Sequence, residues 1–193
     1  MSDYDVPGVD LTEDRYEVTQ SLVRNRYEAT DAAGEVVLRG RQKLFRMREE
    51  FPFTDGDGNE AFTVKAGGVL DIAGDYSIVD PATDEPVVVL DNQWTLLADH
   101  WKIRDPDDGA LLAEIQSTST LVMLLRHLPY VGAVFSLLPH RYDITDADGD
   151  RVGGIEGQFS LKDRYEVTVT DTSDVPREAV TAAAMVIDAI EGN

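Results

Sequence analysis

Residues 173–193 read SDVPREAVTAAAMVIDAIEGN, and this stretch decides the fold. Its proline suits the first turn of a helix, and Glu178 suits the positive end of the helix dipole. Beyond them only Thr181 and Asp188 interrupt the apolar run, so the helix is apolar on every face. Such a helix is buried in a core or in a membrane, and about 20 residues are needed to cross a bilayer. Because the run is shorter, we expect a central helix over residues 174–191, surrounded by the rest of the chain.

The composition is strongly acidic. The 193 residues include 37 Asp and Glu, 17 Lys and Arg and no cysteine, with a formal net charge of −20. This balance resembles that of proteins from salt-loving archaea, in which salt screens the self-repulsion of the folded chain. It argues against DNA or RNA as a partner, because nucleic acids are bound by Lys and Arg. The acidic first residues contain no apolar signal segment. We expect a cytoplasmic protein with a flexible acidic leader (1–14) and a single domain (15–193).

A short pattern recurs along the chain: an aromatic residue, an apolar residue two positions later, and an Asp four positions later. Successive starts are 24, 25, 25 and 41 residues apart. The occurrences are Tyr27/Ala29/Asp31, Phe51/Phe53/Asp55, Tyr76/Ile78/Asp80, Trp101/Ile103/Asp105 and Tyr142/Ile144/Asp146. A spacing of two places the aromatic and the apolar side chain on one face of a β-strand. Each occurrence therefore predicts a strand.

A turn and a second strand follow each occurrence. In four of the five, at Asp31, Asp55, Asp105 and Asp146, the Asp opens a segment that ends in or contains Gly, as in hairpin turns. The predicted second strands are residues 36–38, 62–64, 87–90, 111–115 and 152–155. RYEVT at 15–19 and again at 164–168 repeats the same opening at the two ends. About six hairpins give about a dozen strands, too many for an open sheet. We predict a mainly β fold, a closed antiparallel barrel of about twelve strands around the C-terminal helix.

The longest interval contains an apolar insertion over residues 118–139. One interpretation is a lid or helical corner that packs against one end of the barrel. The other is a patch that enters a membrane or joins a second subunit, because large exposed apolar patches mark interaction surfaces. Arg126, His127 and Pro129 divide the insertion, so a spanning helix is not expected. The candidate membrane or partner contacts are Leu121, Leu124, Leu125, Tyr130, Phe135 and Leu138.

The hairpin motifs, together with the helix, resemble the LURP-one-related family. They read RYEATD (26–31), DYSIVD (75–80), HWKIRD (100–105) and RYDITD (141–146). The family is grouped with tubby C-terminal domains and phospholipid scramblases, and this chain resembles a haloarchaeal-type member. The resemblance covers nearly the whole chain and implies a twelve-stranded barrel around a central hydrophobic helix. For function it implies little: tubby domains bind phosphoinositides, and scramblases are membrane proteins that move lipids. Scramblase activity is not expected, because the cysteine-rich segment of scramblases is missing from this sequence.

No catalytic or metal-binding motif emerges. The three histidines are not spaced as zinc ligands, and GGIEG at 153–157 has no Ser at its centre and more closely fits a close-packed or bulged strand. DGDGNE at 55–60 begins like a calcium loop, but Glu60 stands where Gly is required and Ala66 where the bidentate Glu should be. Ordinary turn chemistry accounts for it. We therefore expect no enzyme activity, no cofactor and no metal.

One group of cations stands out against the acidity. Arg39, Arg41 and Lys43 alternate along a predicted strand, which places all three on one face. They are the candidate ligand or phosphate contacts. The alternative is an outward face whose cations pair with neighbouring carboxylates.

These features lead to one functional hypothesis and an alternative. The hypothesis is a non-enzymatic binding module at a phospholipid surface, in which residues 121–138 supply apolar affinity and the cationic face is a secondary contact. The protein would be cytoplasmic and peripheral at the inner membrane surface. The alternative is a soluble scaffold or small-ligand carrier that acts through protein partners. The sequence leaves the oligomeric state open.

Overall fold

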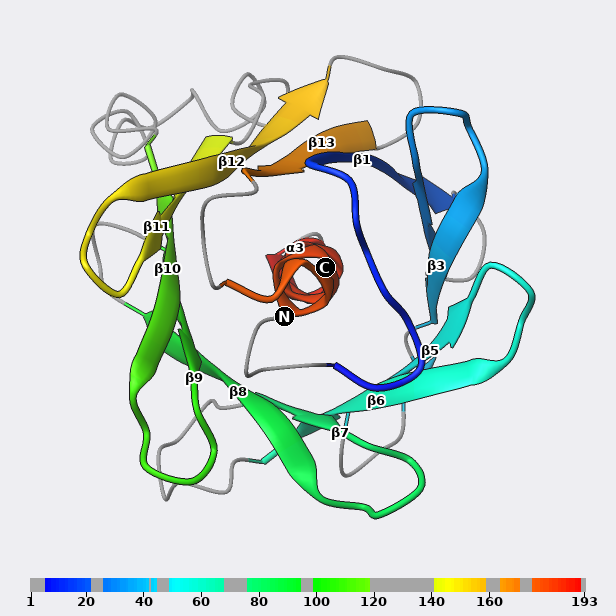
Figure 1. The fold of residues 1–193 in the computed structure, drawn as a ribbon, viewed down its shortest axis with the longest axis horizontal. Coiled ribbons are helices and arrows are strands. Elements are labelled where there is room, and N and C mark those ends of the chain that lie inside the picture. Colours follow the sequence, from blue (N-terminus) through cyan, green and yellow to red (C-terminus); the bar gives the residue numbers. More distant parts are fainter. Residues whose placement is uncertain are drawn as a thin grey trace, which may run out of the picture.

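The chain forms a β-barrel with a helix along its centre (Figure 1). The computed structural model describes residues 6–21, 26–41, 43–44, 49–67, 76–94, 99–118, 141–158, 164–170 and 175–191. The strands are β1 (Arg15–Ser21), β2 (Arg26–Thr30), β3 (Val36–Arg41), β4 (Lys43–Leu44), β5 (Glu49–Asp55), β6 (Glu60–Ala66), β7 (Tyr76–Val79), β8 (Pro86–Trp94), β9 (Asp99–Arg104), β10 (Leu111–Ser117), β11 (Arg141–Asp146), β12 (Arg151–Gln158) and β13 (Arg164–Val169). The helix is α3 (Arg177–Glu191).

The sheet closes on itself as an antiparallel ring. Apart from β3 and β4, consecutive strands pair with each other, β1 pairs with β13, and the pairing of β3 with β5 completes the circle. β3 and β4 pair with β5 in one continuous register, with Gly40 opposite Phe53 and Lys43 opposite Glu50. They therefore occupy the place of one interrupted strand, and the ring has twelve positions. The predicted closed barrel of about twelve strands is confirmed.

The recurring sequence pattern builds two inner layers of the barrel. The aromatic positions lie near the starts of alternate strands and point inward, where ring centroids of Tyr76 and Trp101 are 6.0 Å apart. The members of this aromatic belt are Tyr27, Phe51, Tyr76, Trp101, Tyr142 and Tyr165. The apolar residues two positions later form the next layer, and Ile78, Ile103 and Ile144 are fully buried. Sequence spacing of two thus becomes a stacked core, because alternate side chains share a face.

Helix α3 fills the space that these layers enclose. From Ala179 to Ile187 every residue is at most 3 % exposed, including Thr181. The helix begins at Arg177, slightly later than expected from the sequence, and Val180 N–H donates to the carbonyl of Pro176 at its first turn. The prediction of a buried central helix is confirmed.

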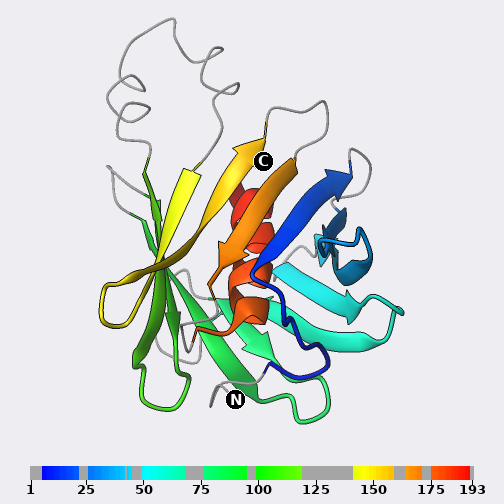
Figure 2. The same ribbon diagram turned by 45° about the horizontal axis from the view of Figure 1, so that its top comes forward.

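The two ends of the barrel differ (Figure 2). The turns at 31–35, 55–59, 80–85, 105–110 and 146–150 all lie at the end where α3 begins, which we call the turn end. At the other end β2 begins with Arg26, β3 ends with Arg41 and β11 begins with Arg141, and α3 reaches Glu191. We call this the arginine end. The antiparallel order of the strands fixes this division, because every hairpin of the repeat turns at the same end.

Two neighbouring glycines of β12 test how tightly the strands approach. A Cβ on Gly153 would lie 1.9 Å from the carbonyl oxygen of Thr168, whereas one on Gly154 would lie 3.1 Å from that of Tyr142. A β-bulge at Ile144/Thr145 lies opposite, so the predicted close-packed or bulged strand is confirmed. We expect Gly153→Ala to lower the free energy of unfolding by about 1–3 kcal/mol or more, as overpacking does. Gly154→Ala is the control and should cost clearly less. Equal denaturation midpoints for the two variants would contradict this packing.

Candidate functional site

The aspartates of the repeat hold the turns at the turn end. The Asp55 carboxylate accepts hydrogen bonds from the backbone and side-chain nitrogens of Asn59, each 2.8 Å long. The bond from the Asn59 side chain is the main reason why the pKa of Asp55 is lowered. Asp146 Oδ1 likewise accepts from the backbone of Asp148 and Asp150. The segment at 55–60 that begins like a calcium loop and the segment at 146–150 are therefore hairpin turns whose carboxylates are engaged by their own backbone. Within the described ranges no group of three or more His, Asp or Glu could hold a metal ion.

An N-terminal strap, residues 6–14, crosses the turn end (Figure 1). Val6 and Leu11 are 1 % and 3 % exposed. The Leu11 N–H donates to Glu178 Oε1 at 2.6 Å, and Arg177 Nη2 lies 3.0 Å from Asp14 Oδ1. The expected flexible leader is therefore wrong over its described part. Val6 and Leu11 lie among acidic residues, and their side chains are buried at the turn end of the core. Their burial and the two polar contacts hold the strap in place.

The strap leads to a testable prediction. Leu11→Ala should lower the free energy of unfolding by about 2–5 kcal/mol, the usual cost of truncating a buried leucine. Thr12→Ala is the control: Thr12 is exposed, and exposed substitutions usually change stability by less than about 0.5 kcal/mol. Chemical denaturation of both variants measures the difference. Identical midpoints would mean that the strap contributes nothing.

The candidate cations of β3 have different surroundings. Arg39 is engaged: its Nε lies 3.4 Å from Glu28 Oε1, and its Nη1 donates to the backbone carbonyls of Asp55 and Gly56. Arg41 is exposed, and the residue opposite it on β2 is Arg26, which is exposed as well. Lys43 lies in β4, but its side chain is outside the described part. The structure therefore brings Arg41 together with Arg26, and it assigns Arg39 to the hairpin.

The arginine end gathers the cations that have no described carboxylate beside them. Elsewhere the described basic side chains pair with Asp or Glu, as Arg15 does with Glu166 and Arg151 with Asp143. Among the side chains that the structure describes, those with no carboxylate within ion-pair distance are Arg26, Arg41 and Arg141. All lie at this end. The sequence pattern does not single out Arg26, because its neighbour is set by the register between two strands.

The apolar insertion also joins the barrel at the arginine end. Thr118 is its first residue and Arg141 lies just beyond its end, and the Thr118 N–H donates to the Arg141 carbonyl at 2.9 Å. The six candidate contacts of the insertion, from Leu121 to Leu138, lie outside the described residues. Their common point of attachment is nevertheless fixed, because β10 ends at Ser117 and β11 begins at Arg141 at this end of the barrel.

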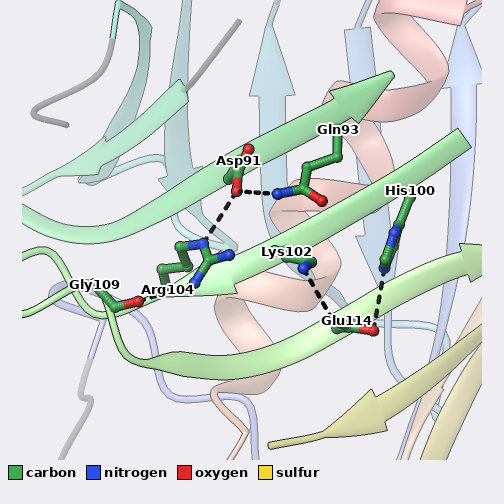
Figure 3. A network of polar contacts seen from close by, with 7 residues as sticks. All are labelled: Asp91, Gln93, His100, Lys102, Arg104, Gly109 and Glu114. Carbon is green, nitrogen blue, oxygen red and sulfur yellow. Dashed lines mark hydrogen bonds and ion pairs between the residues drawn. The ribbon is translucent and has the colours of Figure 1, made fainter. Parts of the chain in front are cut away.

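A polar network joins β8, β9 and β10 on the side of the sheet that faces away from α3 (Figure 3). Asp91 is fully buried, and its Oδ2 accepts from Arg104 Nε at 3.1 Å and Gln93 Nε2 at 3.2 Å. Arg104 also donates to the carbonyl of Gly109, which anchors the adjacent turn. Charge-assisted hydrogen bonds of this kind compensate for burial of the carboxylate. This part of the network therefore ties two strands and a turn together.

The second part of this network centres on Glu114. Its carboxylate lies 3.1 Å from His100 Nε2 and 3.4 Å from Lys102 Nζ. The His100 contact is close, but this nitrogen has no hydrogen-bond partner in the described part of the chain. The contact is therefore poorly aligned for a hydrogen bond. The carboxylate lies between Lys102 and His100, so Lys102 and Glu114 form a cross-strand ion pair beside the imidazole.

Buried tyrosines make stability depend on alkaline pH. Burial raises the pKa of Tyr16 to about 12, and burial followed by the negative charge of Asp188 raises the pKa of Tyr165 well above its ordinary value. The folded state therefore holds these protons more tightly than the unfolded state, whose tyrosines titrate near pH 10. Stability should be complete below about pH 10 and fall as the pH rises towards about 12. Tyr16→Phe should weaken this dependence. The titration is monitored by tyrosinate absorbance. If every tyrosine of the folded protein titrated near pH 10, the predicted loss of stability at alkaline pH would be contradicted.

Comparison with known proteins places the chain in a family. Its sequence matches the family described as LURP-one-related over residues 36–188, which is most of the barrel and the helix. The chain belongs to the LURP-one-related family. This LURP-one-related chain is also similar in structure to a protein from Arabidopsis thaliana solved by X-ray crystallography. The two share 10 % sequence identity with a TM-score of 0.58, over 99 % of this chain and 96 % of the other.

That structural likeness concerns the fold alone. No curated protein matches the LURP-one-related chain in sequence. In the part of the chain that the structure describes, no helix has the length and apolar character needed to cross a membrane.

Proposed function

We propose that this chain is a non-enzymatic, tubby-like binding module that associates with anionic phospholipid surfaces through its arginine end. The observation that carries the proposal is the placement of Arg26, Arg41 and Arg141 at one end, with no described carboxylate within ion-pair distance of any of them. The aspartate-rich turns occupy the opposite end. A chain with a net charge of −20 is repelled by an anionic surface unless it presents such an end to it.

The apolar insertion supports the same orientation. Both of its flanks lie at the arginine end, so we propose that Leu121, Leu124, Leu125, Tyr130, Phe135 and Leu138 contact the membrane there. The acidic composition also leads us to propose a haloarchaeal-type protein that works in concentrated salt. The Debye length is only about 3 Å at 1 M salt, so long-range attraction is weak, and the apolar contact would supply most of the affinity. The protein would then be cytoplasmic and peripheral at the inner membrane surface.

Flotation with liposomes tests the proposal. The protein is mixed with phosphatidylglycerol-containing or pure phosphatidylcholine vesicles in molar KCl, beside a variant whose residues 121–138 are replaced by a short Gly/Ser turn. We expect the intact protein to float, more with the anionic vesicles, and the variant to remain in the dense fraction. Circular dichroism confirms that the variant keeps its β-structure. An intact protein that never floats at any salt concentration would overturn the proposal and leave the soluble scaffold or ligand carrier.

A further inference from the structure

We propose that Arg26 and Arg41 form one site for a phosphomonoester group. The inference deepens the proposed function and rests on it for the lipid source of that group, because it names the chemistry that the arginine end would recognise. Arg26 begins β2 and Arg41 ends β3, and the two residues lie directly opposite each other in the antiparallel ladder. Side chains at such positions have Cβ atoms about 4.5–5.5 Å apart on the same face of the sheet. Both side chains are exposed, so a ligand can reach both guanidinium groups.

The neighbouring pair on the same two strands shows what a satisfied position looks like. Two residues further along, Glu28 lies opposite Arg39, and their charged groups are 3.4 Å apart. At the next position on this face the acid is replaced by a second arginine. Like charges placed directly opposite each other destabilise a sheet. The chain has 37 acidic and 17 basic residues, so a carboxylate would be the commoner neighbour of an arginine. Because this pair has two arginines instead, a bound anion from outside the chain would neutralise it.

The geometry favours a phosphomonoester over other anions. Each guanidinium presents a planar fork of donors that matches two phosphate oxygens. A phosphomonoester carries a charge of about −1.5 to −2 near pH 7 and three terminal oxygens, so it can be shared by two forks. A carboxylate or a phosphodiester carries a single charge and neutralises only one arginine. The group can come from the headgroup of a lipid such as phosphatidic acid, or from a small soluble phosphate.

The experiment separates the site from the membrane proposal. Flotation is measured at one fixed ionic strength with phosphatidylcholine vesicles that contain equal fractions of phosphatidic acid or phosphatidylglycerol. The test variant is Arg26→Gln/Arg41→Gln. The control is Arg15→Gln/Arg151→Gln, which removes the same charge from two largely exposed arginines near the turn end. Circular dichroism and thermal unfolding verify that all proteins are folded. Calorimetric titration with inorganic phosphate and glycerol 3-phosphate supplies the soluble arm.

We expect the wild-type protein and the control to bind phosphatidic acid vesicles about tenfold more tightly than phosphatidylglycerol vesicles, the effect of a single charge-assisted hydrogen bond. The test variant should lose this preference while still binding through other contacts. Equal binding of both vesicles by the wild-type protein would overturn the site and leave the membrane proposal intact. Arginine-dependent binding of soluble phosphate without flotation would support the site and overturn its membrane role. Binding of neither vesicles nor phosphate would overturn both.

Discussion

Replacement of Ala183 by Asp should abolish folding. Ala183 is fully buried at the middle of α3, inside the ring of strands. A carboxylate at this position would lose its hydration without gaining a partner, which costs several kcal/mol. The whole stability of a domain is only about 5–15 kcal/mol. We therefore expect insoluble protein, or a variant that shows no cooperative unfolding transition by circular dichroism.

A glycine at the same position separates the buried charge from the helix propensity. Ala183→Gly should cost only about 1 kcal/mol, the usual difference between the two residues in a helix interior, and it should fold. Ala184→Asp repeats the charge test at a neighbouring buried position, 3 % exposed. A soluble Ala183→Asp variant with a normal unfolding transition would mean that α3 is not the centre of the fold.

Truncation of Trp101 should give the second largest effect. Among the side chains that the structure describes, Trp101 is the largest fully buried one, 2 % exposed, and it packs in the aromatic belt beside Tyr76. Trp101→Ala removes this area and leaves a cavity among rigid strands, so we expect a loss of about 3–5 kcal/mol in the free energy of unfolding. Urea denaturation followed by far-ultraviolet circular dichroism measures this loss, because that signal does not depend on a tryptophan probe.

Trp101→Phe is the matched variant, because it keeps an aromatic ring at the same place in the belt. It should cost clearly less than Trp101→Ala. Comparable losses for the two variants would show that the belt does not depend on filled aromatic positions, and the structural reason for the repeat would be lost.

Much of the fold could be predicted because its pattern is local. The spacing of Tyr142, Ile144 and Asp146 within one strand predicts which side chains face inward and where the following turn begins. The same spacing makes the same prediction in the other repeats. Closure was also predictable, since a dozen strands do not remain open and an all-apolar helix must be enclosed. The strap was not, because Val6 and Leu11 are isolated apolar residues in an acidic segment. The Leu11 backbone N–H donates to Glu178, which lies far away in the chain, and a local sequence pattern does not contain such a contact.

The candidate site was only partly predictable for a related reason. The alternation of Arg39, Arg41 and Lys43 correctly placed Arg39 and Arg41 on one face of β3. Which of them is neutralised depends on the neighbouring strand, where Glu28 faces Arg39 and Arg26 faces Arg41. That register is set by the hairpin turn between β2 and β3, including a bulge at Ala29/Thr30, and residue patterns alone do not contain it.

Site-directed labelling tests most directly whether the arginine end faces a membrane. The chain contains no cysteine, so a single fluorescent label can be placed on Ser21→Cys, at the arginine end, or on Asp148→Cys, in a turn at the opposite end. Each labelled protein is mixed with anionic vesicles that carry a lipid-linked quencher. We expect strong quenching of the label at position 21 and little at position 148. Quenching at position 148 with none at position 21 would contradict the proposed orientation.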